Sequence, residues 1–112
     1  MGLNNKFYTN DEKYMFAGNF PVVTAQAICN EKIVKGEVIG YNNAFEFGKY
    51  GDTYTNIYGI AFEDSGKKTG DDTKEYCEVL LTGEFHNSFV VIPEGKENET
   101  KIKLRNINIF IK

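Results

Sequence analysis

Short runs in which apolar side chains alternate with other residues constrain the fold of this chain most strongly. The first run, residues 22–29, has its side chains on two sides of an extended chain: Val23, Ala25, Ala27 and Cys29 on one, and Val22, Thr24, Gln26 and Ile28 on the other. Because both sides carry apolar residues, this run predicts a strand covered on both faces or a strand in the wall of a small barrel.

Further runs along the chain show the same period of two. Residues 37–41 predict a short strand, and the glycines at 36 and 40 predict close approaches of the backbone. Residues 53–62 alternate so that Tyr58 and Ile60 share a face. Residues 74–82 and 106–111 alternate in the same way, and antiparallel pairing of 53–62 with 74–82 is the simplest topology.

The segments between these runs predict connections. Residues 42–52 carry turn formers and three aromatic residues, which is typical of a loop that packs its own side chains. Residues 63–73 predict a polar connection, Gly83 is expected to end the strand before it, and residues 94–100 predict at most one helical turn. The fold class is therefore mostly β, a small β-barrel or sandwich-like single domain with at most one or two short helices.

Length and charge restrict the class of protein. A chain of 112 residues predicts one domain, here residues 16–112, preceded by a flexible N-terminal arm over residues 1–15. The formal net charge is −3 and the basic residues form no block, so no nucleic-acid partner is expected. No apolar run has the length of a membrane span, and the first ten residues do not have the pattern of a secretory signal.

Residues with reactive side chains do not form a recognisable catalytic motif. His86 is the only histidine, and the acidic pairs Asp11-Glu12 and Asp71-Asp72 do not have calcium-loop spacing. Cys29 and Cys77 are far apart in alternating runs, which favours buried thiols and leaves a disulfide open. We therefore expect no enzyme activity, no cofactor and no metal site.

Five segments in order resemble the head decoration protein family of tailed phages and prophages. They are residues 18–24 (GNFPVVT), 35–40 (KGEVIG), 58–64 (YGIAFED), 83–86 (GEFH) and 104–109 (LRNINI), and their order and spacing carry the resemblance. It extends over residues 16–112.

The resemblance implies a structural virion protein that binds the outside of an expanded phage head and stabilises it against the pressure of packaged DNA. The implied partner is the major capsid protein, the implied assembly on the capsid is a homotrimer, and synthesis would occur in the host cytoplasm. In this family the N-terminal arm adds extended backbone to a strand of the capsid protein. In this chain the implied capsid-binding residues of the arm are Phe7, Tyr8, Tyr14 and Met15.

Two alternatives remain open at this stage. One is another phage structural component, in a tail or baseplate. The other is a small β module that binds a ligand such as a carbohydrate on a platform made by Phe45, Phe47, Tyr50 and Tyr54.

Overall fold

The computed structural model describes residues 16–18 and 20–112, which form seven strands and one helix. In chain order these are β1 (Val23–Cys29), β2 (Val38–Tyr41), β3 (Phe47–Lys49), β4 (Asn56–Ala61), β5 (Gly66–Lys68), β6 (Asp71–Phe85), α3 (Glu97–Arg105) and β7 (Ile109–Ile111). The mostly β fold class with one short helix is confirmed.

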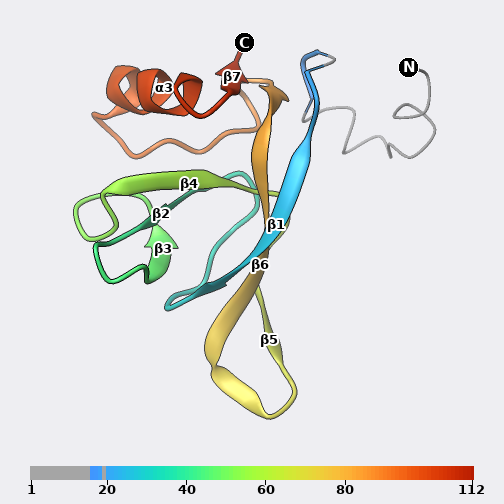
Figure 1. Ribbon diagram of the computed structural model, residues 1–112, viewed down its shortest axis with the longest axis vertical. Helices are drawn as coiled ribbons and strands as arrows, with labels where there is room; N and C mark the ends of the chain where they lie inside the picture. The colour runs from blue at the N-terminus through green and yellow to red at the C-terminus, as the bar shows by residue number, and fades with distance from the viewer. Residues whose placement is uncertain (1–15, 19) are drawn as a thin grey trace, which may run out of the picture.

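Five of the strands close into a barrel in the order β1-β3-β2-β4-β6, because β6 also pairs with β1. Figure 1 shows β1 and β6 side by side along the long axis of the molecule. Their antiparallel register sets Ala25 opposite Val79 and Ala27 opposite Cys77. The predicted antiparallel pairing of β4 with β6 is confirmed, while β1 meets β3 in a single parallel pair, Cys29 with Phe47.

β1 is a strand of the barrel wall, the second of the two possibilities that its sequence allows. Ala27 and Cys29 are buried inside the barrel, whereas Gln26 is exposed and Ile28 is 47% exposed. One face of β1 therefore packs on the core and the other faces solvent, as is common in antiparallel sheets.

The sheet made by β2, β4 and β6 separates two hydrophobic cores. The barrel core fills the inside of the barrel and contains Ala27, Cys29, Ile33, Ile39, Ala61, Cys77 and Val79. The helix-side core lies between the other face of the sheet and the C-terminal layer of α3 and β7, and it contains Val38, Tyr50, Ile60, Leu80, Phe85, Phe89, Val90, Leu104 and Ile109. Val79 and Leu80 belong to different cores because neighbouring strand residues point to opposite faces.

A β-bulge corrects the predicted faces of residues 53–62. The register between β2 and β4 shifts after Ile39, so that Gly59 lies opposite Ile39 but Ile57 lies opposite Gly40, which leaves Tyr58 without a partner of its own. Strict alternation predicts Tyr58 and Ile60 on one face, yet Tyr58 packs on the barrel core and Ile60 belongs to the helix-side core. One extra residue in one strand reverses the face of every residue beyond it.

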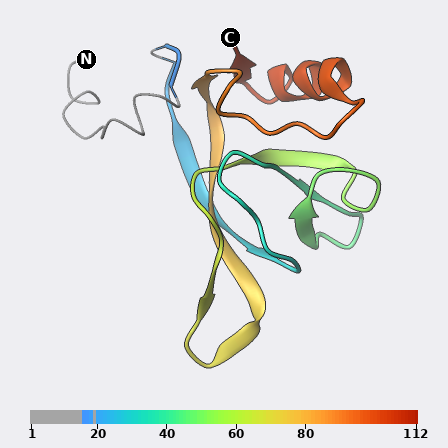
Figure 2. The same cartoon turned by 180° about the vertical axis from the view of Figure 1, so that it is seen from behind.

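Two segments predicted as connections contain strands. β3 lies within residues 42–52 and pairs with β2, and β5 lies within residues 63–73 and pairs with β6. Figures 1 and 2 show β5 and the first half of β6 as a hairpin that extends from the barrel at the end opposite α3. Gly70, with a φ of +87°, makes its turn. Both strands are short and rich in glycine and lysine, so they are formed by pairing with a neighbour and have little strand propensity of their own.

β6 is longer than predicted, because Gly83 continues the strand instead of ending it. Gly83 lies opposite Ile109 of β7, and the parallel pairing continues to Phe85 opposite Ile111. The φ of +147° at Gly83 explains why glycine occupies this position within a strand. β6 therefore pairs with four other strands, β1, β4, β5 and β7.

The helix is longer than the single turn predicted. α3 has acidic side chains in its first turn and Lys103 and Arg105 in its last, which is favourable for the helix dipole. It buries only Thr100 and Leu104, so its apolar stripe is too narrow to stand out in the sequence. Thr100 Oγ1 is buried and has no hydrogen-bond partner among the described residues.

We expect Thr100→Val to raise the free energy of unfolding by about 1 kcal/mol, because it removes a buried hydroxyl that forms no hydrogen bond and keeps the side-chain shape. Thr100→Ser is the control, since it keeps the hydroxyl and removes a methyl group, and it should lower the stability by about 1 kcal/mol. Urea unfolding of the three proteins measures both changes. A loss of stability in Thr100→Val would show that the hydroxyl makes a favourable contact.

Candidate functional site

The four arm residues predicted to bind the capsid, Phe7, Tyr8, Tyr14 and Met15, lie outside the described residues. The described chain begins at Phe16, which forms an antiparallel bridge with Phe85. The centroids of the two rings are 5.5 Å apart. The Ala17 N–H donates to the Glu84 carbonyl at 2.9 Å. Residues 16–18 and 20–23 thus join the body along the last part of β6.

Two side chains of β6 hold this entry segment in place. The Glu84 carboxylate accepts the Phe20 N–H at 3.2 Å through Oε1 and pairs with Lys112 Nζ at 2.8 Å through Oε2. The Thr82 hydroxyl donates to the Pro21 carbonyl at 2.7 Å and accepts the Val23 N–H at 3.1 Å. We call residues 16–18 and 20–23, with their partners on β6 and Lys112, the entry anchor.

The predicted aromatic platform is divided by the fold. Tyr50 is 5% exposed and belongs to the helix-side core. Its hydroxyl donates to Glu99 Oε2 at 2.9 Å and accepts from Lys103 Nζ at 3.1 Å, both on α3. The Tyr50 hydroxyl, by hydrogen bonding, lowers the pKa of Glu99 and raises that of Lys103. Tyr54 is half-buried, with its ring next to Gly48.

Phe45 and Phe47, the other two residues of the predicted platform, cluster with two tyrosines that the sequence did not single out. Phe47 lies 4.8 Å from Tyr58 between ring centroids, and Tyr41 contacts both of them. Phe45 stacks on Tyr41 at 6.1 Å with 20° between the ring planes. We call Tyr41, Phe45, Phe47 and Tyr58 the aromatic ridge. Tyr41 and Tyr58 were missed because the bulge and the hairpin that bring them to this end of the barrel have no clear sequence signal.

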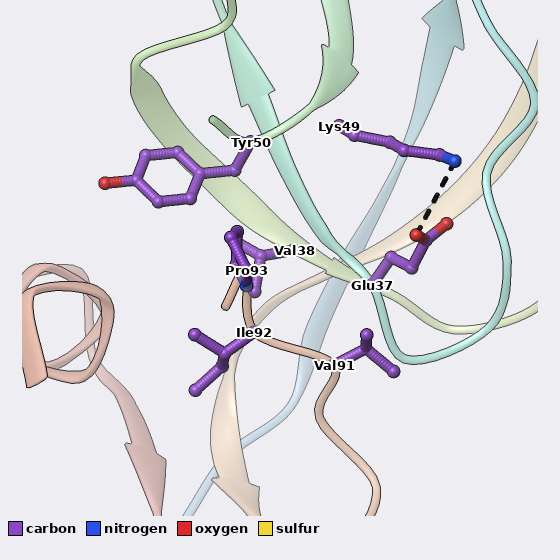
Figure 3. A pocket seen from close by; sticks show the side chains of 7 residues that line it. All are labelled: Glu37, Val38, Lys49, Tyr50, Val91, Ile92 and Pro93. Atoms are coloured by element: carbon purple, nitrogen blue, oxygen red, sulfur yellow. Dashed lines mark ion pairs between the residues drawn. The ribbon is translucent and has the colours of Figure 1, made fainter. Parts of the chain in front are cut away.

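A hollow of about 220 Å³ is lined by Glu37, Val38, Lys49, Tyr50, Val91, Ile92 and Pro93. Figure 3 shows these side chains, which come from β2, β3 and their flanking residues and from the segment before α3. The Glu37 carboxylate is engaged on both oxygens: Oε1 accepts the Val34 N–H at 2.6 Å and Oε2 lies 3.8 Å from Lys49 Nζ. The Tyr50 side chain extends toward α3, where its hydroxyl is held. The polar groups of this hollow therefore hold the body together and do not converge on a ligand.

Both cysteines are buried free thiols, as their alternating context predicts. Burial raises the pKa of Cys29 to about 11 and that of Cys77 to about 12. Since the thiolate is the reactive form, neither side chain provides a nucleophile near neutral pH. The folded state holds these protons more tightly than the unfolded chain, so the contribution of the two thiols makes the protein less stable as the pH rises above about 9.

Within residues 16–18 and 20–112, no three His, Cys, Asp or Glu side chains come together in a geometry that would hold a metal ion. The helix that the structure describes is too short to cross a bilayer.

No protein-family model matches this chain, and no curated protein sequence matches it.

Proposed function

We propose that this chain is a structural protein of a phage head, which binds the outer surface of the expanded capsid and stabilises it against the pressure of packaged DNA. Its partner is the major capsid protein, it acts on the capsid as a homotrimer, and it resides on the exterior of the virion. The resemblance of residues 16–112 suggests this function, and the entry anchor is the observation that supports it best.

A capsid staple needs a firm connection between the segment that grips the shell and the folded body. In this chain that connection is the entry anchor, where backbone and side-chain hydrogen bonds tie residues 17, 20, 21 and 23 to Thr82 and Glu84. A mechanical force applied to the residues that precede Phe16 would act on several of these hydrogen bonds at the same time. β6 would then transmit this force to the four strands with which it pairs.

The strand edges of the body disfavour a partner strand that adds to β5. The barrel leaves few strand edges open, and β5, which lies at an edge of the sheet, is three residues long and carries two lysines. Short, charged edge strands disfavour uncontrolled pairing with other chains. In the proposed function, the N-terminal residues and not β5 supply the strand that is added to the capsid protein.

Trimer formation would turn three weak contacts with the capsid into one high-avidity attachment. Once one arm has bound, the other two arms of the same trimer are confined near their own sites at a high effective concentration. The dissociation of the whole trimer then requires three contacts to break at the same time. Many trimers on one shell would resist its outward deformation.

The test is to add the full chain, and a variant that lacks residues 1–13, to empty expanded heads and to measure what sediments with the heads. We expect the full chain to co-sediment and the truncated chain to remain in the supernatant, because the backbone that would add to a capsid strand is missing. Circular dichroism and thermal unfolding of the truncated chain should match those of the full chain.

A second variant separates side chains from backbone in the arm. Full-length protein with Phe7, Tyr8, Tyr14 and Met15 all changed to alanine should bind more weakly than the natural chain and more strongly than the truncated one, because its backbone hydrogen bonds remain. Undiminished binding by the truncated, folded chain would refute the arm contact. Sedimentation with isolated tails but not with heads would favour the alternative of a tail or baseplate component.

A further inference from the structure

The barrel is closed between β1 and β3 at one end of β1 only. The two strands share a single pair, Cys29 with Phe47, and the Asn30 N–H donates to the Phe47 carbonyl at 2.9 Å. Along residues 23–28, β6 is the one described strand that pairs with β1. In Figures 1 and 2, no described strand or helix lies along the other edge of the first half of β1. This part of β1 therefore has a free edge.

The free edge carries the backbone groups of Thr24 and Gln26. Successive strand residues point their N–H and C=O groups to opposite edges, so residues two or four apart point to the same edge. Since the Asn30 N–H points to β3, the groups of Gln26 and Thr24 point away from β6. The register agrees: Gln26 lies opposite Glu78, whose carbonyl accepts the Phe62 N–H on the other side of β6. The backbone groups of Thr24 and Gln26 are thus unpaired within the described chain.

This edge lacks the features that usually protect an open strand edge. Residues 22–28 (VVTAQAI) carry no charge and no proline. Thr24 and Gln26 are exposed, and the apolar residues Val23 and Ile28 are 50% and 47% exposed. Edge strands are usually short or charged, as β5 is, because an uncharged and exposed edge readily pairs with another strand. The free edge of β1 therefore has the character of a surface for strand pairing.

The same segment of a second copy is complementary to this edge. With a two-fold axis at Ala25, antiparallel pairing sets Thr24 of each copy opposite Gln26 of the other. In each of these pairs the two residues exchange both N–H···O bonds, so every backbone group of Thr24 and Gln26 gains a partner. The hydroxyl and amide side chains of each pair lie next to each other on the exposed face, where they can hydrogen bond. No like charges meet along residues 22–28.

We propose that two copies of this chain associate by antiparallel pairing of their β1 free edges, with Thr24 opposite Gln26. The pairing joins the two β1–β6 ladders into one continuous sheet. A two-fold contact uses the same surface on both copies and is complete with two chains. It is therefore a different contact from that of the proposed trimer, and it does not depend on the proposed capsid function.

The first test is sedimentation velocity of the full-length chain at concentrations from about 10 μM to about 1 mM. We expect a reversible equilibrium between one chain and two, with a dissociation constant on the order of 0.1 mM, because a contact between two short strand segments is small. A chain that stays monomeric over the whole range would overturn the proposal.

Two full-length variants with matched substitutions test the register. Both contain Gln26→Lys, and they differ only in Thr24→Lys or Thr24→Glu. In the proposed register, the lysine pair sets like charges opposite each other, whereas the glutamate and lysine pair sets opposite charges together. We expect the first variant to associate roughly ten-fold more weakly than the natural chain and the second at least as tightly as the natural chain. Equal association of the two variants would overturn the proposal.

Both variants should fold, because the two positions are exposed and a lysine at position 26 would lie opposite Glu78. Circular dichroism and thermal unfolding at low concentration check this. Amide hydrogen exchange in the natural chain gives an independent measurement. The Thr24 and Gln26 amides should be protected at high concentration and lose protection on dilution, while the Ala25 and Ala27 amides, which point to β6, should stay protected. Exchange at Thr24 and Gln26 that does not depend on concentration would overturn the pairing.

Other contacts between copies give different results. Association that is lost on deletion of residues 1–13 would assign the free edge to the arm of the second copy. Association that Phe45→Ala abolishes and the two lysines leave unchanged would assign the contact to the aromatic ridge. Either result would overturn the β1 pairing. Co-sedimentation of the two charge variants with expanded heads tests the proposed function separately, because both variants keep the arm and the entry anchor.

Discussion

Replacing Gly59 with alanine is expected to lower the free energy of unfolding by about 3 kcal/mol or more, enough to leave much of the chain unfolded at 37 °C if its stability is typical of a small domain. A Cβ at this position would lie 2.4 Å from the Leu80 carbonyl oxygen and 2.6 Å from Val79 Cγ1. The first of these is a backbone atom of β6, so it cannot move aside as the end of a side chain can. Relief of the clash requires β4 and β6 to separate where they pair in the barrel wall.

Gly66→Ala is the matched control for this effect. Gly66 also lies in a strand, β5, but a Cβ there would meet no atom within 4 Å. Its replacement should change the stability by no more than about 0.5 kcal/mol. Urea unfolding followed by circular dichroism measures both variants. Similar stabilities of Gly59→Ala and Gly66→Ala would mean that β4 and β6 are not in close contact at this point.

Phe85→Ala is expected to cost about 3–5 kcal/mol, the usual range for the removal of a fully buried phenylalanine. Phe85 is fully buried in the helix-side core, and its ring lies 5.5 Å from that of Phe16 and 6.2 Å from that of Phe89. It also pairs with Ile111 of β7. The cavity would therefore loosen the entry segment, the segment before α3 and the C-terminal strand together.

Phe45→Ala is the control for Phe85→Ala, because it removes the same side chain from a site that is 74% exposed. It should change the free energy of unfolding by no more than about 0.5 kcal/mol. Hydrogen exchange adds a second measurement: in Phe85→Ala, the Ala17 and Lys112 amides, which donate to the Glu84 and Phe85 carbonyls, should lose protection first. Equal stability of the two variants would contradict the assigned core.

The two hydrophobic cores illustrate what can be predicted from a sequence of this kind. Alternation over residues 74–82 correctly places Cys77, Val79 and Leu81 on one face of a strand and Leu80 on the other. The glycines at 36 and 40 were correctly predicted to allow close backbone approach: a Cβ would lie 2.3 Å from the Phe89 carbonyl oxygen at Gly36 and 2.4 Å from the Tyr54 carbonyl oxygen at Gly40. These predictions succeed because they depend on local steric rules.

The aromatic residues illustrate what cannot be predicted in this way. Phe45, Phe47, Tyr50 and Tyr54 are close in sequence and were grouped for that reason, yet Tyr50 is buried beneath α3. Tyr41 and Tyr58 join Phe45 and Phe47 because β2 pairs with both β3 and β4. A cluster assembled across three strands depends on their register, which the residue types of one strand do not reveal.

By itself, the sequence determined that this protein is a mostly β domain with buried thiols and at most short helices, since the period of two, the glycines and the short apolar runs act locally. Only the tertiary structure decided the closure of the barrel, the bulge at Tyr58, the strands β3 and β5 and the position of Phe45 at an exposed turn. These features arise from pairing between segments that are distant or weakly strand-forming. The free energy that stabilises them comes from contacts with the rest of the fold and not from the residues that adopt them.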